Sequence, residues 1–484
     1  MENKKVLLVA LNANFHHTNL ALRYFYESLS AADFDVSYLE MTINDQYDKI
    51  VEGIYNYHPS VIMFSCCIFN IEIVNKLAYT LKCVLPETII CCGGPEVSYE
   101  SLEYIRENNS VDAVFRGDGD EAICIVAQML LDKTYTESKL LTTRNRLSDY
   151  IISEKFKYLP SPYKPLGNLK HRLVYYEASR GCPFNCSYCL SSAEKSLRFV
   201  PKEKVIEDVV YLDGLGVKVI KFTDRTFNAD AGRALTLFKA FSTLDLQSTL
   251  HFEICADLLT QEILEFLTTV KENLFRFEIG VQSLNEKTLS AINRRSDTKK
   301  LLDSIKFLHK NTKIHIHVDL ISGLPYYTAK DLACDFNTLY HHSHQLQIGI
   351  LKFLKGTKLR EEAHLYNYKY NNFPPYNLLC GDDITYDEIA EIGHLSYTLQ
   401  KFKESGNFNK SIDYLVSVFD TPFEMFLKLS AHFKEASREG PLSMRNMYFL
   451  LIDFAKQYDF TDDEHIKDLI NADFYNKYSN LLIF

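Results

Sequence analysis

Three cysteines within one short segment are the residues best suited to chemistry. Cys182, Cys186 and Cys189 lie in EASRGCPFNCSYCLSS (177–192), directly after a predicted strand over 172–179. Thiolates on a short turn can hold an iron–sulfur cluster, and with three protein ligands one iron stays open to bind and reduce another molecule. The alternatives are chance spacing and a three-thiolate zinc site. Zinc would want a fourth Cys or His nearby, and no His follows within the next dozen positions.

The other cysteines carry no such spacing. Cys66–Cys67 and Cys91–Cys92 lie inside apolar, strand-like runs, where we expect them to be small buried hydrophobic residues. The N-terminal stretch MENKKVLLVAL is short and lacks a small-residue cleavage site, so it is typical of a first strand. The apolar run over 61–74 is interrupted by polar residues, which predicts no membrane span. We therefore expect a cytoplasmic protein with reduced cysteines.

Length and charge limit the possible classes of protein. A chain of 484 residues is expected to form two or three domains. Its hydrophobic fraction of 46% and charged fraction of 24% are those of a folded globular protein. A formal net charge of -10 argues against a general nucleic-acid binder, although a local basic groove would be compatible with it.

Residues 1–133 alternate strand-like and amphipathic helical stretches, which predicts a doubly wound, Rossmann-like parallel sheet. Ligands of such sheets bind at the carboxyl ends of the strands. Two loops expected at that edge bear glycine, GGPE at 93–96 and RGDGDE at 116–121, and neither matches the dinucleotide fingerprint. Residues 134–171 are polar and weakly patterned, and we interpret them as a linker.

Residues 172–370 contain six further strand-like runs separated by helical stretches, which predicts a partial (β/α)6 barrel. Alternate positions of these strands are polar, for example Glu253, Glu278 and Asp319, and the opposite face is apolar. The apolar face can meet the helices, leaving the polar face to point into the barrel. An antiparallel sheet with one wet face is the alternative, which the intervening helices disfavour. A polar lumen costs stability unless its groups are paired or bind something, so we interpret it as the active cavity. Residues 371–484 show mainly helical patterning and predict a helical C-terminal region.

The cysteine segment resembles the radical S-adenosylmethionine superfamily, whose hallmark is CxxxCxxC with an aromatic residue before the last cysteine. Tyr188 fills that place. The resemblance implies a 4Fe–4S cluster on Cys182, Cys186 and Cys189. Its open iron would bind S-adenosylmethionine and cleave it to a 5′-deoxyadenosyl radical, with electrons from a reductant such as flavodoxin or ferredoxin.

The resemblance extends to the cobalamin-linked branch of that superfamily. It is carried by FTDRTFN (222–228), FEIGVQSLNEKTLSAINR (277–294) and VDLISGLP (318–325). By analogy with that branch, the residues expected to contact S-adenosylmethionine are Tyr188, Thr223, Asp224, Glu253, Gln282, Ser283 and Arg294. Each could instead be a lumen residue with a structural partner.

The first domain is similar to the cobalamin-binding domain of the same branch, and the whole chain is similar to members with an uncharacterised helical C-terminal domain. The usual DxHxxG motif is absent, and His16 and His17 lack its context. We therefore expect cobalamin to bind without a protein His ligand. The residues expected at its site are Asn14, Ser65, Gly93, Gly94, Pro95, Glu96 and Gly117.

The resemblance implies an enzyme that joins a deoxyadenosyl radical to cobalamin, in the first instance a methyltransferase acting on an unactivated carbon of an unknown substrate. The alternatives are a cobalamin-assisted rearrangement, cyclisation or oxidation, and a non-catalytic cobalamin or redox sensor. A methylthiotransferase would want a second three-cysteine cluster in the first domain, and the paired cysteines there lack that spacing.

Overall fold

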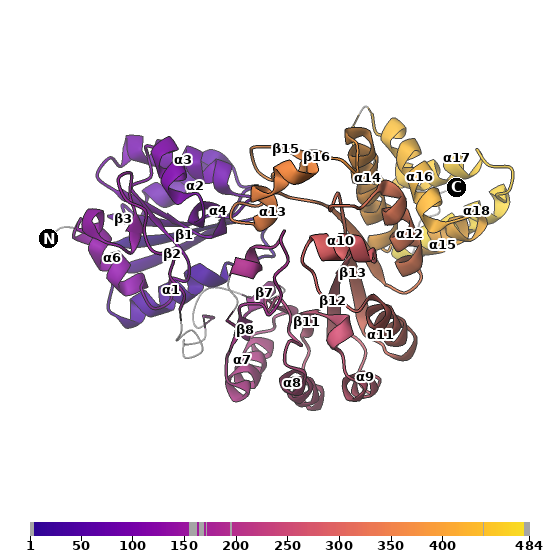
Figure 1. The fold of residues 1–484 in the computed structure, drawn as a ribbon, viewed down its shortest axis with the longest axis horizontal. Coiled ribbons are helices and arrows are strands. Elements are labelled where there is room, and N and C mark those ends of the chain that lie inside the picture. The colour runs from indigo at the N-terminus through magenta and orange to yellow at the C-terminus, as the bar shows by residue number, and fades with distance from the viewer. Residues whose placement is uncertain are drawn as a thin grey trace.

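The computed structural model describes residues 4–153, 162–163, 169–170, 172–193, 196–438 and 440–478. Three parts follow one another along the chain: an N-terminal α/β domain, a central half-open barrel and a C-terminal helical region (Figure 1). This is the α/β architecture that the sequence predicts. None of the helices in the described ranges is long and apolar enough to cross a bilayer.

The first domain contains a six-stranded sheet in the order β2-β1-β3-β4-β5-β6. Its five parallel strands are β1 (Val6–Asn12), β2 (Val36–Thr42), β3 (Val61–Ser65), β4 (Ile89–Gly93) and β5 (Ala113–Phe115). The strand β6 (Leu141–Thr142) joins β5 in the antiparallel direction, so part of the segment predicted as a linker belongs to this sheet. The middle of that linker lies largely outside the described residues.

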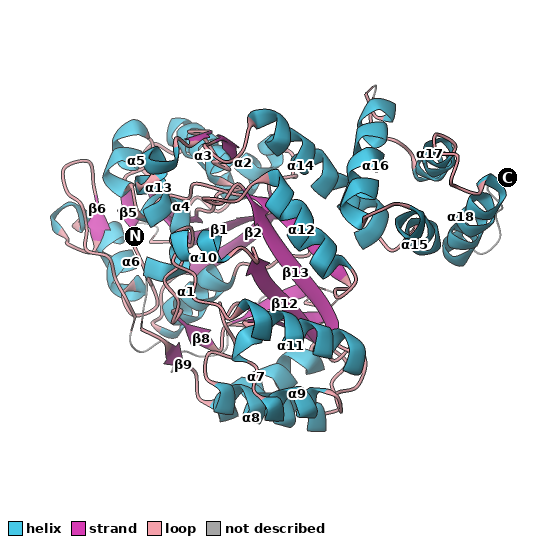
Figure 2. Cartoon of the chain, turned by 45° about the vertical axis from the view of Figure 1, so that its right-hand side comes forward, coloured by secondary structure: helices cyan, strands magenta, loops and turns pink. Residues whose placement is uncertain are grey.

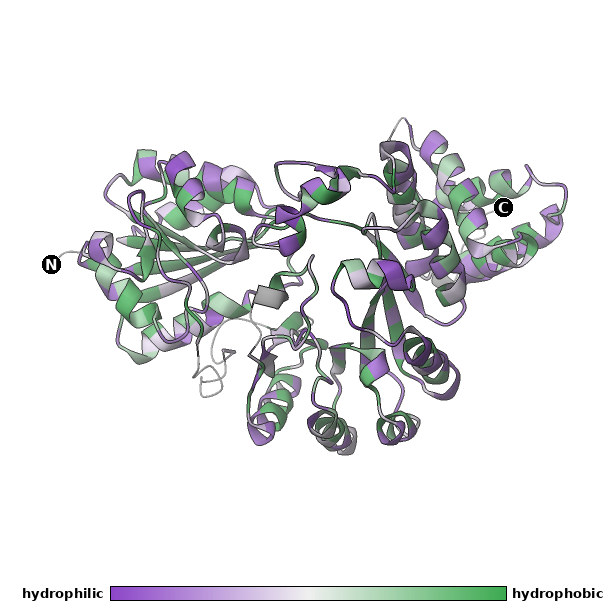
Figure 3. Cartoon of the chain, viewed as in Figure 1, coloured by the Kyte–Doolittle hydropathy of each residue, from purple (hydrophilic) through white to green (hydrophobic). Residues whose placement is uncertain are grey.

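Helices cover both faces of this sheet, as the apolar character of its strands requires. They are α1 (Leu20–Ala31), α2 (Tyr47–Tyr55), α3 (Ile71–Val84), α4 (Pro95–Ser98), α5 (Ser101–Glu107) and α6 (Ile123–Leu131). All seven residues of β1 are buried: Leu7, Val9 and Leu11 belong to one core and Val6, Leu8 and Ala10 to another. Figure 3 shows hydrophobic residues concentrated along the strands of this sheet.

The central sheet has six parallel strands in the order β14-β13-β12-β11-β10-β7. They are β7 (Leu173–Tyr176), β10 (Val219–Phe222), β11 (Thr249–Ile254), β12 (Phe275–Gln282), β13 (His315–Ser322) and β14 (Gln345–Ile350). In the described part of the chain β7 and β14 are not paired with each other, so the barrel is open along one side. The short strands β8 (Ser179–Arg180) and β9 (Arg198–Phe199) pair near the end of β7.

Helices pack on the outer face of the central sheet, as Figure 2 shows. The helices of this part are α7 (Lys202–Gly214), α8 (Ala231–Thr243), α9 (Gln261–Leu267), α10 (Glu286–Ala291), α11 (Thr298–Asn311) and α12 (Ala329–Tyr340). The strand β12 alternates buried and half-buried residues along its whole length. Its buried residues, such as Phe275 and Phe277, belong to the core shared with the helices, and its polar residues Arg276 and Glu278 face the lumen. The two-sided strand pattern predicted from the sequence is confirmed.

After β14 the chain turns back toward the first domain before it enters the helical region (Figure 1). This segment holds α13 (Lys358–Glu361), β15 (Lys369–Tyr370) and β16 (Leu378–Cys380). Tyr376 donates a hydrogen bond to Glu96 of the first domain, and Arg360 lies 3.3 Å from Glu100. The helical region then comprises α14 (Tyr386–Leu399), the π-helical turn η6 (Gln400–Glu404), α15 (Asn409–Val418), α16 (Pro422–Ala436), α17 (Met444–Ala455) and α18 (Asp463–Tyr478).

Candidate active site

The cysteine loop leaves the end of β7 and is held from two sides. On one side the buried Asp224 accepts hydrogen bonds from the Ala178 amide at 2.9 Å and the Ser179 hydroxyl at 2.5 Å. On the other side the Ser187 amide donates to the carbonyl of Ile292 at 2.9 Å. Each bond joins the loop to a neighbouring part of the barrel, so the positions of the cysteines are fixed by the barrel around them.

The three cysteines line one cavity of about 200 Å³ at the carboxyl end of the barrel. Cys182 and Cys186 are buried, and Cys189 is half-buried. The Cys186 sulfur lies 3.9 Å from Nη1 of Arg294, and the Cys182 sulfur lies 3.9 Å from the Thr226 hydroxyl. Burial raises the pKa of the Cys186 thiol, and the Arg294 guanidinium opposes that rise.

The arrangement of the thiols fits an iron–sulfur cluster better than a single metal ion. Among the described residues, no three His, Cys, Asp or Glu side chains are grouped as the ligands of one ion. A zinc site would require such a group. In a cubane cluster each thiolate binds a different iron, so its cysteines surround the cluster rather than converge on one point.

Polar groups beside the cysteines are left open toward this cavity. Gln282 stands at a bulge of β12 with φ of 69°, and its buried Oε1 has no hydrogen-bond partner in the described structure. Arg294 donates to the carbonyl of Gly280. Glu253 lies 3.9 Å from Lys221 and 4.0 Å from Arg225, and burial raises its pKa. An unpartnered acceptor and a carboxylate next to three thiols suit a ligand with hydrogen-bond donors, such as the amino and ribose groups of S-adenosylmethionine.

The candidate S-adenosylmethionine residues fall into two groups. Tyr188, Glu253, Gln282 and Arg294 line the cysteine cavity. Thr223 lines a neighbouring cavity instead. Asp224 is 3% exposed and bound to the cysteine loop, and Ser283 is 1% exposed and bonded to Asp335 and the Asn285 amide.

Sequence reasoning did not single out several residues that line the cysteine cavity as its contacts. They are Phe184, Arg225, Thr226, Ile254 and Gly280. Cys255, Glu278 and Asp319 also line the cavity, and they belong to the polar strand faces that the sequence predicted to point into the barrel. Arg225 and Thr226 belong to FTDRTFN, the segment from which Thr223 and Asp224 were selected. The same motif could have indicated these two residues. Which of its side chains point into the cavity, however, depends on how the loop turns after β10.

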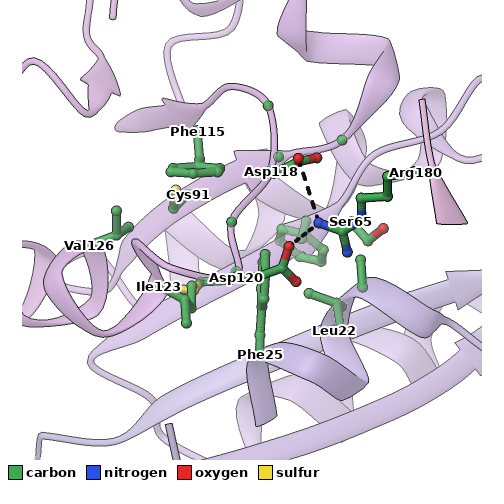
Figure 4. A pocket seen from close by; sticks show the side chains of 17 residues that line it. Leu22, Phe25, Ser65, Cys91, Phe115, Asp118, Asp120, Ile123, Val126 and Arg180 are labelled. Atoms are coloured by element: carbon green, nitrogen blue, oxygen red, sulfur yellow. Dashed lines mark hydrogen bonds and ion pairs between the residues drawn. The ribbon is translucent and has the colours of Figure 1, made fainter. Parts of the chain in front are cut away.

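A second cavity, of about 140 Å³, lies at the carboxyl edge of the first sheet (Figure 4). Ser65, Gly93, Gly94 and Gly117 line it together with apolar side chains, which are those of Leu22, Phe25, Met63, Phe115, Ile123 and Val126. A dry apolar cavity of about 150 Å³ accommodates one aromatic ring. The apolar part of the lining suits contact with an aromatic group such as the nucleotide base of cobalamin, and Asp118, Asp120 and Arg180 line the polar part.

Close backbone approach shapes the edge of this cavity. Gly94 has φ of 112°, and a Cβ there would stand 2.5 Å from the carbonyl oxygen of Cys66. Gly117 has φ of 87°, and a Cβ there would stand 2.1 Å from the carbonyl oxygen of Ile151. Both positions consequently require glycine.

Three residues predicted near cobalamin lie outside this cavity. Asn14 is exposed and accepts a hydrogen bond from the His16 amide at 2.9 Å. Pro95 is exposed at the start of α4. Glu96 is 5% exposed, accepts a hydrogen bond from Tyr376 and lies 3.2 Å from Lys355. Glu96 thus joins the first domain to the segment after β14.

The two histidines of the first loop differ in their surroundings. His16 is exposed, whereas Nδ1 of His17 lies 2.7 Å from the hydroxyl of Tyr175 in the barrel. Burial lowers the pKa of His17, and the nearby cations His16, Lys221 and Arg172 lower it further. A neutral imidazole bonded to the barrel is the arrangement that this geometry favours.

A third cavity, of about 290 Å³, separates the first domain from the barrel. Tyr99, Asp118 and Tyr150 line it from one side, and barrel residues including Arg225 line it from the other. Arg225 also lines the cysteine cavity, and Arg180 also lines the cavity of the first sheet. The three cavities therefore follow one another from the first sheet to the cysteines.

Family comparisons divide the chain in the same way. Residues 6–127 match the B12 binding domain, and residues 176–336 match the radical SAM superfamily. Residues 364–481 match a protein family of unknown function, DUF4080. The first two matches imply a 4Fe–4S cluster, S-adenosylmethionine and cobalamin as cofactors.

Individual relatives are distant. The chain is 24% identical over 72% of its length to the cobalamin-dependent radical SAM methyltransferase TokK of Streptomyces tokunonensis, and it spans 54% of that protein. It is 22% identical over 63% of its length to the hopanoid C-3 methylase of Methylococcus capsulatus, and it spans 60% of that protein. The chain thus spans little more than half the length of these curated relatives.

A solved structure shows the same fold. The radical S-adenosylmethionine methyltransferase TsrM of Kitasatospora setae, determined with cobalamin and a 4Fe–4S cluster bound, aligns with a TM-score of 0.65 at 14% identity over 99% of this chain and 100% of that one. The family matches agree with the position of the cysteine cavity and with the architecture shared with this structure. The chain therefore combines a B12 binding domain and a radical SAM domain with a C-terminal domain of the DUF4080 family.

Proposed function

We propose that this protein is a cobalamin-dependent radical S-adenosylmethionine methyltransferase that methylates an unactivated carbon. The observation that carries the proposal is the position of Arg225, which lines both the cysteine cavity and the cavity below the first domain. A substrate at this junction could meet both cofactors. When bound, the cluster and S-adenosylmethionine supply a 5′-deoxyadenosyl radical, and cobalamin supplies a methyl group.

The chain's own residues would bind and orient these groups. Cys182, Cys186 and Cys189 would hold the cluster. Arg294 is placed between the Cys186 sulfur and the Gly280 carbonyl, where its guanidinium can also orient a carboxylate. Gln282 offers a free acceptor oxygen in the same cavity.

Glu253 and Arg225 would contact and position the substrate in the cavity. The 4.0 Å separation between their charged groups leaves both in contact range of a polar ligand. Asp224 would act as a positioning residue, because it holds the start of the cysteine loop without lining the cavity.

The named relatives favour methyl transfer over a rearrangement, cyclisation or oxidation. TokK is described as a methyltransferase and the protein of Methylococcus as a methylase. We expect the electrons to come from a soluble carrier such as flavodoxin or ferredoxin in the cytoplasm. Comparing these carriers with dithionite as the reductant would test that expectation.

The decisive experiment is anaerobic reconstitution of the full chain with iron, sulfide and cobalamin, followed by reductive cleavage of S-adenosylmethionine. We expect the charge-transfer absorption of a 4Fe–4S cluster, bound corrinoid and formation of 5′-deoxyadenosine. Cys182→Ala, Cys186→Ala and Cys189→Ala should each lose the cluster absorption, while Cys334→Ala, at an exposed position, should keep it. Absence of deoxyadenosine from the reconstituted protein would refute the radical reaction, and activity without bound corrinoid would refute the role of cobalamin.

A further inference from the structure

The C-terminal domain covers one edge of the open barrel, that of β14. The edge strand β14 lacks a strand partner on its outer side in the described structure, and α14 and η6 pack against it. The Ser396 hydroxyl donates to the carbonyl of Ile348 at 2.8 Å, and the Gln345 amide donates to Glu404 at 3.3 Å. Figure 1 shows α14 beside the barrel at its junction with the helical region. Covering an edge strand in this way also prevents it from pairing with another chain.

The helix turns a polar stripe toward this strand. The stripe consists of Gly393, Ser396, Tyr397, Gln400 and Glu404, which with Gln347 of β14 line a cavity of about 280 Å³. The opposite stripe is apolar and buried, and it consists of Ile389, Ile392, Leu395, Leu399 and Phe402. Ser396 and Glu404 of this stripe bond to the edge strand. The side chains of Gln400 and Gln347 line the same cavity, where their polar groups can reach a ligand.

The π-helical turn belongs to this cavity. Gln400 and Glu404 are its first and last residues, and both line the cavity. A π-helical turn is rare and is found mostly at functional sites, because the extra residue redirects the side chains that follow it. Here it allows Glu404 to reach Gln345 of the edge strand.

This cavity borders the lumen that contains the cysteines. Asp319 of β13 lines the cysteine cavity, and its partner in register on β14 is Gln347. Paired residues on neighbouring parallel strands point to the same face and lie about 5 Å apart. One strand spacing therefore separates the two cavities on the inner face of the sheet.

The charges around this cavity favour a cation. None of its lining residues is Lys or Arg, and Lys403 is directed to Asp413 at 3.0 Å. Lys401 lies over the ring of Tyr397, 5.2 Å from its centre. The Asp319 carboxylate is matched by His317 at 3.1 Å.

Glu404 keeps unused acceptor capacity. Among the described residues its hydrogen-bond donor is the Gln345 amide, at 3.3 Å, and a carboxylate can accept about four hydrogen bonds. Burial raises its pKa, and the charge of His317 and the hydrogen bond from Gln345 oppose that rise.

We propose that α14 and η6 build a substrate subsite in which Glu404, assisted by Gln400 and Gln347, binds an ammonium group. The proposal rests on the proposed function in that the ammonium would belong to the substrate of the neighbouring cysteine cavity. The C-terminal domain would then set substrate specificity as well as cover the barrel.

The test measures binding of n-butylammonium to the full chain by saturation-transfer NMR titration, with n-butanol and butyrate as the neutral and anionic probes. We expect butylammonium to bind about tenfold more tightly than butanol, since a hydrogen bond to a charged group is the stronger kind. Glu404→Gln should weaken butylammonium binding by about tenfold. Glu391→Gln, at an exposed position on the same helix, should leave it unchanged.

A second variant, expected to gain affinity, distinguishes a specific effect from a loss of binding caused by misfolding. Gln400→Glu adds a second carboxylate to the cavity and should tighten butylammonium binding by several-fold. Equal binding of the three probes, no binding to the wild-type chain, or equal affinities of the wild-type and Glu404→Gln chains would each overturn the proposal. The titration needs no cluster or cobalamin, so ammonium binding without deoxyadenosine formation would refute the proposed function alone.

Discussion

Replacing Arg180 with methionine would test how the first domain is joined to the barrel. The guanidinium lies 3.6 Å from Asp118 and in contact with Asp120 (Figure 4), and it lies 2.8 Å from Glu177. The Arg180 side chain is 12% exposed, and that of Asp120 is 4% exposed. Methionine would preserve most of the packing but leave three carboxylates without the cation that they share.

The expected cost follows from the burial of these charges. Removing one partner of a buried ion pair costs about 3–5 kcal/mol, because the remaining charge is left uncompensated. In a cooperative unit of 150–250 residues, such a loss lowers Tm by about 6–20 °C. Arg438→Met provides the matched control, since its pair with Glu435 is 77% and 69% exposed. The control should lose at most about 1 kcal/mol.

The loss should also depend on pH. Burial already raises the pKa of Glu177, with Arg180 opposing the rise, so removing Arg180 raises that pKa further. A carboxyl group whose folded pKa exceeds its unfolded value loses stability as pH rises toward the folded pKa. The deficit of Arg180→Met should therefore be larger at about pH 8 than at about pH 5.5.

Thermal unfolding followed by circular dichroism at both pH values measures this deficit. Adding Glu177→Gln and Asp120→Asn to Arg180→Met should recover much of the lost Tm, because the unpaired charges are then removed. The reasoning fails if Arg180→Met unfolds like the control. It also fails if its deficit is the same at both pH values and the neutralised variant recovers nothing.

Three further predictions concern the cavities and the loop. Gly280→Ala would place a Cβ 2.3 Å from the amide nitrogen of Gln282, so we expect weaker S-adenosylmethionine binding in equilibrium dialysis with cluster content unchanged. Gly119→Ala would place a Cβ 2.1 Å from the ring of Phe25, and we expect loss of bound corrinoid while iron content stays at the wild-type level; normal corrinoid content would contradict the assignment of that cavity. Burial raises the pKa of Asp224 to about 7, so the wild-type chain should lose stability as pH rises from about 4 to about 7, and Asp224→Asn should flatten this part of the pH profile of Tm.

Sequence patterns predicted the parts of the fold that depend on local periodicity. Continuous apolar runs such as Val6–Leu11 identified strands covered on both faces, and the alternation over Phe275–Gln282 identified a strand with one face in a lumen. The positions of the cysteines followed because a motif directly after a parallel strand must lie at the carboxyl edge of the sheet.

Contacts between distant segments could not be predicted in this way. Glu96 and Tyr376 are 280 positions apart, and no local pattern indicates that the turn-back segment brings them together. Asp224 shows a second limit, because a loop after a strand has no fixed period and the side to which each residue points is set by its hydrogen bonds. The π-helical turn at Gln400–Glu404 is likewise determined by packing on β14, since its sequence, QKFKE, resembles that of an ordinary helix.

Charge pairing between side chains of the lumen reduces the number of polar groups that can bind a ligand. Glu278 lies 2.7 Å from Lys221 and 3.0 Å from His251. Burial alone would raise the pKa of Glu278, but these two partners lower it to about 2. The three groups thus compensate one another and offer little to a ligand. Gln282 lines the same cavity as Glu278 and differs, because it retains a buried oxygen without a partner in the described structure. The number of polar residues in the lumen therefore does not indicate how many of them bind a ligand. Among the residues that line the cysteine cavity, Gln282 and Arg294 keep buried polar atoms without a partner in the described structure, and these atoms lie beside the thiols.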